Sequence, residues 1–89
     1  MEWEWESIAG PFNRLTEGPA WDGSRLFFTH IPASRIMSYD SVSGDCSIYR
    51  ENTNHTNGLG FDVNGNLYGC CSGGRAIVRF EQDGSTTTI

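Results

Sequence analysis

The chain is short and acidic, with 89 residues, a mass of 9.9 kDa and a formal net charge of -5 at pH 7. Nucleic acids and anionic membranes are unsuitable partners, because both require a concentrated basic surface and the Arg and Lys residues here are few and scattered. A chain of this size buries only about 60–65% of the surface that its unfolded form exposes, so it forms one small domain or a part of a larger one.

The first 15 residues differ from the rest of the chain. Trp3 and Trp5 alternate with glutamates, a period-2 pattern that predicts a strand with one aromatic and one acidic face. We expect residues 1–15 to form an N-terminal strand or closing segment; a solvated, disordered start is the alternative. Because the segment lacks the regions of a signal peptide and no run is long enough to span a membrane, we expect a cytoplasmic protein.

From residue 16 onwards the sequence nearly repeats itself at an interval of about forty residues. Residues 16–22 (TEGPAWD) return as residues 56–62 (TNGLGFD), and residues 35–40 (RIMSYD) return as residues 76–81 (AIVRFE). The correspondence divides the chain into two copies of one structural unit, residues 16–55 and residues 56–89.

Each copy contains short runs of aromatic and β-branched residues separated by turn residues. In the first copy these runs span residues 18–21, 25–30, 35–39 and 45–50. Asp22-Gly23 and Asn64-Gly65 predict the first turn of each copy, because Asp, Asn and Gly adopt positive φ at low cost. We therefore predict an all-β fold of two four-stranded antiparallel β-propeller blades, blade 1 in residues 16–55 and blade 2 in residues 56–89.

Two blades are too few to close a propeller ring. We expect a fragment or one subunit of an assembly, with the missing blades supplied by other copies of the chain, for example as a cyclic trimer, or by another chain. Left open, the two blade faces are expected to expose the aromatic residues of the strands to solvent. These residues are Trp21, Phe27, Phe28, Phe61, Tyr68 and Phe80.

The three cysteines, Cys46, Cys70 and Cys71, form neither an even disulfide framework nor a spaced metal motif. Adjacent residues of a strand point to opposite faces, so Cys70 and Cys71 are not expected to bind one metal together. We interpret all three as small, partly buried strand residues.

Glu17 and Asn57 are the candidate site residues. The first strand of a propeller blade lines the central channel, and these two residues hold equivalent positions at the start of their blades, each before a glycine that permits close backbone approach. A carboxylate and a carboxamide that converge can bind a hard cation, which in turn can polarise a lactone carbonyl or activate water. Simple capping of the strand ends is the alternative.

Several motifs of the chain resemble the amino-terminal blades of the gluconolactonase and regucalcin (senescence marker protein) family, over essentially all of residues 14–89. They are residues 16–21 (TEGPAW), residues 26–32 (LFFTHIP) with Arg35-Ile36, and residues 57–59 (NGL) with Phe61-Asp62 and residues 65–67 (GNL). The resemblance implies a six-bladed propeller that hydrolyses sugar lactones with one divalent cation. Ca²⁺ is the expected cation, and Mg²⁺, Mn²⁺ and Zn²⁺ are the alternatives. The resemblance also implies that Glu17 is a metal ligand, that the other ligands lie in later blades, and that Asn57 contacts substrate or a metal-bound water; it assigns no catalytic residue.

Both histidines receive structural interpretations. His30 stands where the family commonly has Asp, and we interpret it as a structural strand residue. His55 precedes Asn57 by two positions and is expected to be a solvated loop residue, although it could reach the channel mouth. Cys71 and Ser72 stand where gluconolactonases often have an acidic residue and a histidine, a departure that puts lactonase activity in question.

Two functions are compatible with these observations. The first is a fragment or subunit of a gluconolactonase-like, divalent-metal-dependent lactone hydrolase, inactive as a monomer, whose small-molecule partner is a lactone. The second is a non-catalytic, self-assembling or partner-binding propeller module. Neither involves nucleic acid or membrane.

Overall fold

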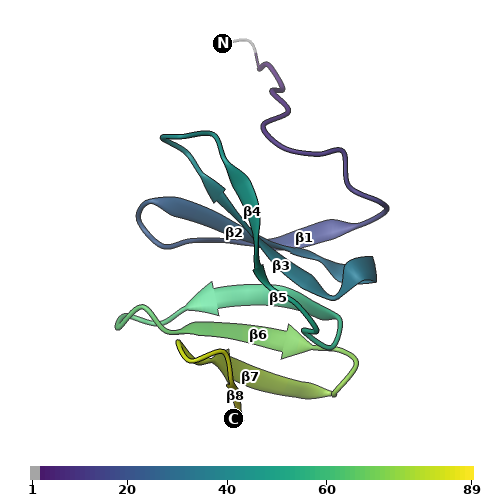
Figure 1. The fold of residues 1–89 in the computed structure, drawn as a ribbon, viewed down its shortest axis with the longest axis vertical. Helices are drawn as coiled ribbons and strands as arrows, with labels where there is room; N and C mark the ends of the chain where they lie inside the picture. Colours follow the sequence, from purple (N-terminus) through teal and green to yellow (C-terminus); the bar gives the residue numbers. More distant parts are fainter. Residues whose placement is uncertain (1–2) are drawn as a thin grey trace.

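The computed structural model describes residues 3–89, which form eight β-strands in two four-stranded antiparallel sheets (Figure 1). Each sheet keeps its strands in chain order, β1-β2-β3-β4 and β5-β6-β7-β8. The strands are β1 (Thr16–Trp21), β2 (Arg25–His30), β3 (Arg35–Asp40), β4 (Cys46–Arg50), β5 (Thr56–Phe61), β6 (Leu67–Cys71), β7 (Ala76–Phe80) and β8 (Thr86–Thr88), with one 3-10 turn, η1 (Ile31–Ala33). The predicted all-β fold of two antiparallel blades is confirmed.

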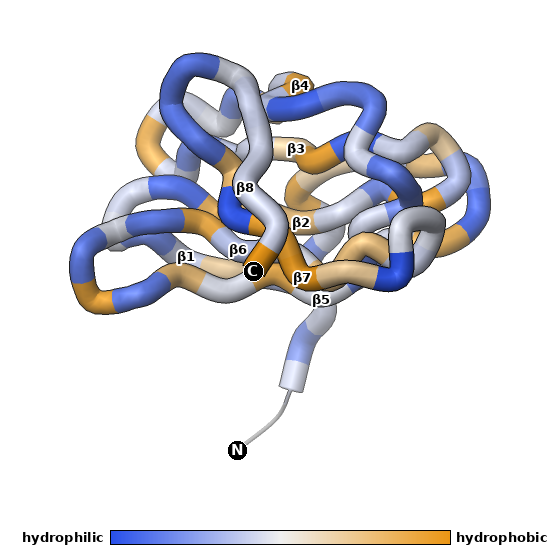
Figure 2. Tube along the Cα trace, turned by 90° about the horizontal axis from the view of Figure 1, so that it is seen from below, coloured by the Kyte–Doolittle hydropathy of each residue, from blue (hydrophilic) through white to orange (hydrophobic). Residues whose placement is uncertain are grey.

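The turn residues explain why the strands are short. Asp22 accepts hydrogen bonds from the backbone N–H groups of Ser24 and Arg25 at 2.9 and 2.7 Å, and Gly23, the residue after Asp22, has a φ of +109°. Asp62 makes the equivalent contacts in blade 2. Such Asp-centred turns satisfy the backbone groups that the chain leaves unpaired when it reverses direction. Figure 2 shows that most of these turns are hydrophilic and that the hydrophobic stretches lie in the strands.

The same irregularity occurs in the first strand of both sheets. The register between β1 and β2 shifts between Glu17 and Ala20, and the register between β5 and β6 shifts between Thr56 and Leu59. A bulge of this kind bends a strand and re-aims its side chains. The repeat in the sequence is therefore a repeat of backbone geometry at the start of each blade.

The core lies between the two blades. Blade 1 contributes Phe27 and Ile36, which are 1% and 0% exposed, and blade 2 contributes most of the remaining core residues. These are Leu67, Cys71, Val78 and Phe80. The rings of Phe27 and Phe61 meet edge to face across the interface, with their centroids 5.3 Å apart.

The expectation that all the blade aromatics are exposed is wrong for Phe27 and Phe80, because each blade face that meets the other blade is buried. Trp21 is 54% exposed, as expected. Cys70 is exposed and Cys71 is buried, so the two adjacent cysteines point to opposite faces, as predicted. The prediction that all three cysteines are partly buried is wrong for Cys46 and Cys70, which are exposed because no other part of residues 3–89 covers them.

The N-terminal segment corrects one prediction. No strand forms in residues 3–15, and Trp3 and Trp5 are 85% and 99% exposed; Met1 and Glu2 lie outside the described residues. A strand needs a neighbouring edge to bond with, and residues 3–6 lie beside none (Figure 1). Whether the segment closes a larger ring stays a prediction.

Part of this segment covers the outer face of blade 1, the face turned away from blade 2. Phe12 packs edge to face on Phe28, with centroids 5.4 Å apart, and its ring lies 5.3 Å from that of His30. The outer face of blade 2 has no such cover from residues 3–89, since Cys70 is exposed and Ile77 is 51% exposed. None of the helical structure in residues 3–89 has the length and apolar character needed to cross a membrane.

Candidate functional site

Glu17 and Asn57 are the second residues of β1 and β5. These two strands contact each other where the blades meet, and they begin at the same end of the molecule (Figure 1). The Glu17 side chain is exposed and that of Asn57 is partly buried. The structure therefore places both predicted site residues at one end of the inter-blade seam.

A single hydroxyl group joins the two positions. Thr29 of β2 is fully buried, and its Oγ1 lies 3.0 Å from the carbonyl oxygen of Glu17 and 3.0 Å from that of Asn57. The two carbonyl oxygens are thus at most twice that distance apart, and they share the hydroxyl proton. Sequence reasoning missed Thr29, because nothing in a β-strand pattern shows which threonine will meet another blade.

Gly18 makes this close approach possible. Its φ is +64°, and a methyl group added to its Cα would overlap the Asn57 carbonyl oxygen and lie 3.1 Å from the carbonyl carbon. Only glycine combines that backbone conformation with that lack of volume. The predicted role of glycine in close backbone approach is confirmed at Gly18. It does not extend to Gly58, where the nearest atom to an added methyl group is Cys70 Sγ at 3.8 Å.

The Asn57 side chain is oriented by the backbone of the next residue. Its Oδ1 accepts a hydrogen bond from the N–H of Gly58. An amide oxygen has two lone pairs, so one remains available, together with the two donors of the Nδ2 group. Asn57 can therefore act as donor or acceptor toward a polar molecule at this end of the seam.

The two residues do not make a complete metal centre. No three His, Cys, Asp or Glu side chains within residues 3–89 lie close enough together to hold a metal ion. A Ca²⁺ ion takes about 6–8 oxygen ligands, and Glu17 supplies one carboxylate. The donors of the described residues thus do not fit a full cation site, and Glu17 stays a predicted ligand for a larger assembly.

His55 is fixed more firmly than a solvated loop residue. Its side chain is exposed, but its backbone N–H donates to Ser34 Oγ at 3.1 Å and its carbonyl oxygen accepts from Ser72 Oγ at 2.8 Å. Its Nδ1 lies 3.1 Å from the Ile31 carbonyl oxygen; since a carbonyl only accepts, Nδ1 donates there. His55 thus ties the linker between the blades to loops of both.

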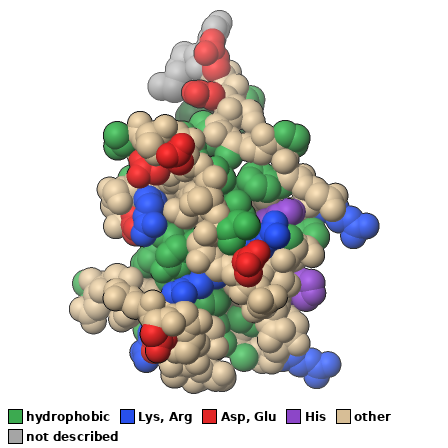
Figure 3. All heavy atoms as spheres, viewed as in Figure 1, with side chains coloured by type: hydrophobic (Ala, Val, Ile, Leu, Met, Phe, Trp, Pro, Cys, Tyr) green, Lys and Arg blue, Asp and Glu red, His purple; other side chains and the backbone are tan. Residues whose placement is uncertain are grey.

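His30 has the structural role that the sequence predicts. Its Nε2 donates to the carbonyl oxygen of Asn13 at 2.9 Å, which fastens the N-terminal segment to the end of β2. Figure 3 shows the histidines in the half of the molecule in which β1 and β5 begin in Figure 1. The imidazoles therefore lie on the same side of the molecule as the candidate site.

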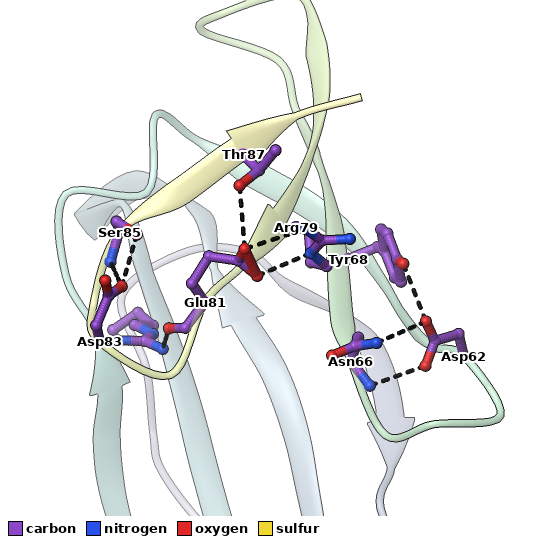
Figure 4. Close-up of polar contacts among 9 residues, drawn as sticks. Asp62, Asn66, Tyr68, Arg79, Glu81, Asp83, Ser85 and Thr87 are labelled. Carbon is purple, nitrogen blue, oxygen red and sulfur yellow. Dashed lines mark hydrogen bonds and ion pairs between the residues drawn. The ribbon is translucent and has the colours of Figure 1, made fainter.

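A polar network follows the outer strands of blade 2 (Figure 4). Arg79 and Glu81 form a two-pronged ion pair at 2.8 and 3.1 Å, and Thr87 donates to the same carboxylate. The hydrogen bonds from Arg79 lower the pKa of Glu81. This network was not anticipated from the sequence, because its members come from different strands.

Beside that network, Asp62 accepts hydrogen bonds from the backbone and side chain of Asn66 and from the hydroxyl of Tyr68. Hydrogen bonds to the charged form of a carboxyl group stabilise that form. These contacts, chiefly those from Asn66, therefore lower the pKa of Asp62 to about 2. The carboxylate is a turn-forming group with its hydrogen-bonding capacity largely used, and it offers little to a ligand.

No protein-family model and no curated protein sequence matches the chain. Solved structures are similar to it. A gluconolactonase from Xanthomonas campestris is 29% identical, with a TM-score of 0.77 over 83% of this chain and 25% of that one. A presumed gluconolactonase is 26% identical, with a TM-score of 0.82 over 93% of this chain and 29% of that one.

A streptogramin B lyase is 20% identical, with a TM-score of 0.66 over 82% of this chain and 25% of that one, a likeness of fold alone. The chain thus spans only about a quarter of the length of these proteins. The resemblance to gluconolactonase propellers that the sequence predicts is confirmed by the first two structures.

Proposed function

We propose that the chain forms two blades of a gluconolactonase-like propeller that hydrolyses a lactone with the help of a divalent cation. The missing blades come from other copies of the chain or from another chain, and the monomer is inactive. Two structural neighbours that are described as gluconolactonases support the reaction class. The observation on which the proposal chiefly rests is that Glu17 and Asn57 lie together at one end of the inter-blade seam.

In the completed ring, each residue has a separate task. Glu17 provides a carboxylate ligand, and the bound cation would polarise the lactone carbonyl or lower the pKa of a water molecule. Asn57 orients the substrate through its Nδ2 donors and the free lone pair of Oδ1. Thr29 and Gly18 hold the starts of the two strands close together.

Activity and cation binding test this proposal. We expect no hydrolysis of glucono-1,5-lactone above the uncatalysed rate, measured by acid release in a pH-stat, for a sample shown by light scattering to be monomeric. In an assembled sample, Ca²⁺ or Mn²⁺ should bind, and Glu17→Gln should weaken that binding at least tenfold in Kd, since one of few charged ligands is lost. Asp45→Asn, which removes an exposed carboxylate from another turn, is the matched control.

The proposal predicts a dependence on assembly as well as on Glu17. A monomer that turns over lactone would contradict it, as would an assembly that hydrolyses lactone equally well after Glu17→Gln.

A non-catalytic, self-assembling or partner-binding module is the second candidate. The outer face of blade 2 favours it, because Ile77 and Cys70 are exposed there beside Tyr68. Surfaces of this kind on a soluble protein commonly mark contact sites. In a cyclic trimer, three copies of Glu17 and three of Asn57 would alternate around the axis.

The mass in solution separates the candidates when it is combined with activity. A stable assembly that neither binds Ca²⁺ or Mn²⁺ nor hydrolyses lactone would support the module. A species that stays at the 9.9 kDa monomer mass at all concentrations would exclude self-assembly and leave only a different chain as the source of the missing blades.

A further inference from the structure

A groove of about 560 Å³ lies between the blades on the side of their outer strands. One wall is formed by the end of β4 and the linker of residues 51–54, and the other by β7, β8 and the turn between them. The volume falls within the roughly 300–1,000 Å³ of small-molecule sites. Glu17 and Asn57 do not line it, so the groove is distinct from the candidate site described above.

Two buried polar atoms of the lining have no hydrogen-bond partner within residues 3–89. They are Nε of Arg50 and Oγ1 of Thr53, and Thr53 as a whole is only 4% exposed. Buried donors are rarely left unpaired, since such a group loses its hydrogen bonds to water without a replacement. Both atoms can donate a hydrogen bond, which points to an acceptor as the missing partner.

The guanidinium of Arg50 is held in place without a direct ion pair among the described residues. Its Nη2 donates to the carbonyl oxygen of Glu81, and its central carbon lies 4.9 Å from the centre of the Tyr49 ring. Within the described part of the chain, three Asp or Glu side chains form ion pairs with arginines, and Arg50 is in none of these pairs. The pKa of Asp83, in the turn between β7 and β8, is lowered chiefly by hydrogen bonds from Ser85 and in part by the charge of Arg50, so Asp83 offsets part of that charge without pairing directly with it. Arg50 therefore brings a positive charge to the groove that no direct carboxylate contact occupies.

The rest of the lining suits a small molecule with a carbon skeleton. Ala76, Val78 and Phe80 supply an apolar wall, and Asn52 and Asn54 add amide groups on the opposite side. Both asparagines have a φ of +54°, a conformation that asparagine tolerates better than most residues. The amide of Asn54 lies beside Gly73 and Gly74, so the linker and the turn before β7 meet at this edge of the groove.

We propose that this groove binds a small organic carboxylate. Its oxygens accept hydrogen bonds from Arg50 and Thr53, because a guanidinium matches the geometry of a carboxylate. Its carbon skeleton lies against Val78 and Phe80. Glu51 also lines the groove and repels an anion, but its carboxylate is 57% exposed and 3.4 Å from Arg35, which offsets its charge. The inference does not depend on the proposed lactone hydrolysis.

The experiment is an NMR titration of the ¹⁵N-labelled chain with sodium gluconate. We expect saturable shifts at the side-chain Nε–H of Arg50 and at the backbone amide of Thr53. Sodium acetate should produce weaker shifts at the same groups, since it lacks the carbon skeleton. Sorbitol has a similar polyol body without the carboxylate, and sodium chloride supplies the same ionic strength; neither should produce saturable shifts at these groups.

Thr53→Val is the decisive variant. The Thr53 hydroxyl has no partner in the chain, so its loss should leave the free energy of unfolding unchanged or higher. Gluconate binding should weaken about tenfold or more, the value of a hydrogen bond to a charged group. Arg50→Lys should weaken it too, Glu51→Gln should strengthen it, and Ser47→Ala, on the exposed part of β4, should not change it.

The proposal is overturned if sorbitol or sodium chloride reproduces the gluconate shifts, or if Thr53→Val binds gluconate as the parent does. A marked loss of stability in Thr53→Val would contradict it as well, since the hydroxyl would then have a partner within the protein.

Discussion

Replacement of Gly18 by alanine should separate the inner strands of the two blades. Gly18 has a φ of +64°, which costs an L-residue about 1–2 kcal/mol. The added methyl group would also overlap the Asn57 carbonyl oxygen. The obstacle is backbone rather than a flexible side chain, so relief requires β1 and β5 to move apart, at a cost typical of overpacking, about 1–3 kcal/mol.

These contributions lower the free energy of unfolding by about 3 kcal/mol in total. A domain of this length has roughly 4–13 kcal/mol, so the loss is a large fraction of its stability. Urea unfolding followed by tryptophan fluorescence and circular dichroism measures the change, with the slope of the transition reporting whether the two blades still unfold together.

Two matched variants isolate the causes. Gly58→Ala, at the equivalent position of blade 2, meets its nearest atom at 3.8 Å and should cost less than about 1 kcal/mol. Gly44 has a φ of +78°, close to that of Gly18, and no atom within 4 Å of an added methyl group, so Gly44→Ala reports the cost of the backbone conformation without the overlap. If Gly18→Ala is no more destabilising than Gly44→Ala, the argument from close approach of the two strands is refuted.

Three further predictions concern other contacts. Thr29→Val should lower the free energy of unfolding by about 1–3 kcal/mol, because two partly buried carbonyl groups lose their donor. Thr29→Ser keeps the hydroxyl and should be less destabilising; a urea midpoint that does not change in Thr29→Val would refute the role of the hydroxyl. The pKa of Asp62 is lowered from 3.8 to about 2 on folding, so its contribution to the free energy of unfolding is fully present above pH 3.8 and is lost as the pH falls toward 2. Over that pH range, the urea midpoint should therefore fall more steeply for the parent than for Asp62→Asn. Parallel curves for the two proteins would count against the role of Asp62. Phe12→Ala should cost about 1 kcal/mol and increase hydrogen exchange in β2 and β3, since Phe28 loses its edge-to-face partner; unchanged exchange would mean that the segment does not protect this face.

The strands and turns of blade 1 were predictable because their signals are local. The predicted run of residues 25–30 is β2, and the predicted run of residues 35–39 is β3 apart from one residue. Alternating side chains and Asp-Gly turns act within a few residues of the chain, so they produce the same local structure wherever the blade is placed. The period of the sequence repeat then fixed the number of blades.

The positions of the candidate site residues were also accessible from the sequence. Glu17 and Asn57 occupy equivalent places in the repeat, and equivalent places in two adjacent blades lie side by side. Their role as a metal ligand and a substrate contact remains a prediction, because it depends on blades that the described residues do not include.

The N-terminal segment shows the limit of pattern alone. The alternation of Trp3 and Trp5 with glutamates is typical of a strand, but no sheet edge lies beside it to complete the hydrogen bonds. The useful contact of the segment is instead made by Phe12, which no periodic pattern distinguishes.

The sequence by itself determined the two-blade β architecture, its turns and the equivalence of Glu17 and Asn57, because repeats and turn residues report local backbone geometry. Only the tertiary structure decided that Phe27 is buried while Ile77 is exposed, that Thr29 bridges two carbonyl groups, and that Arg50 and Thr53 line a groove. The physical reason is that these properties depend on which faces of the two sheets meet, and a strand pattern is the same whichever of its faces another blade covers.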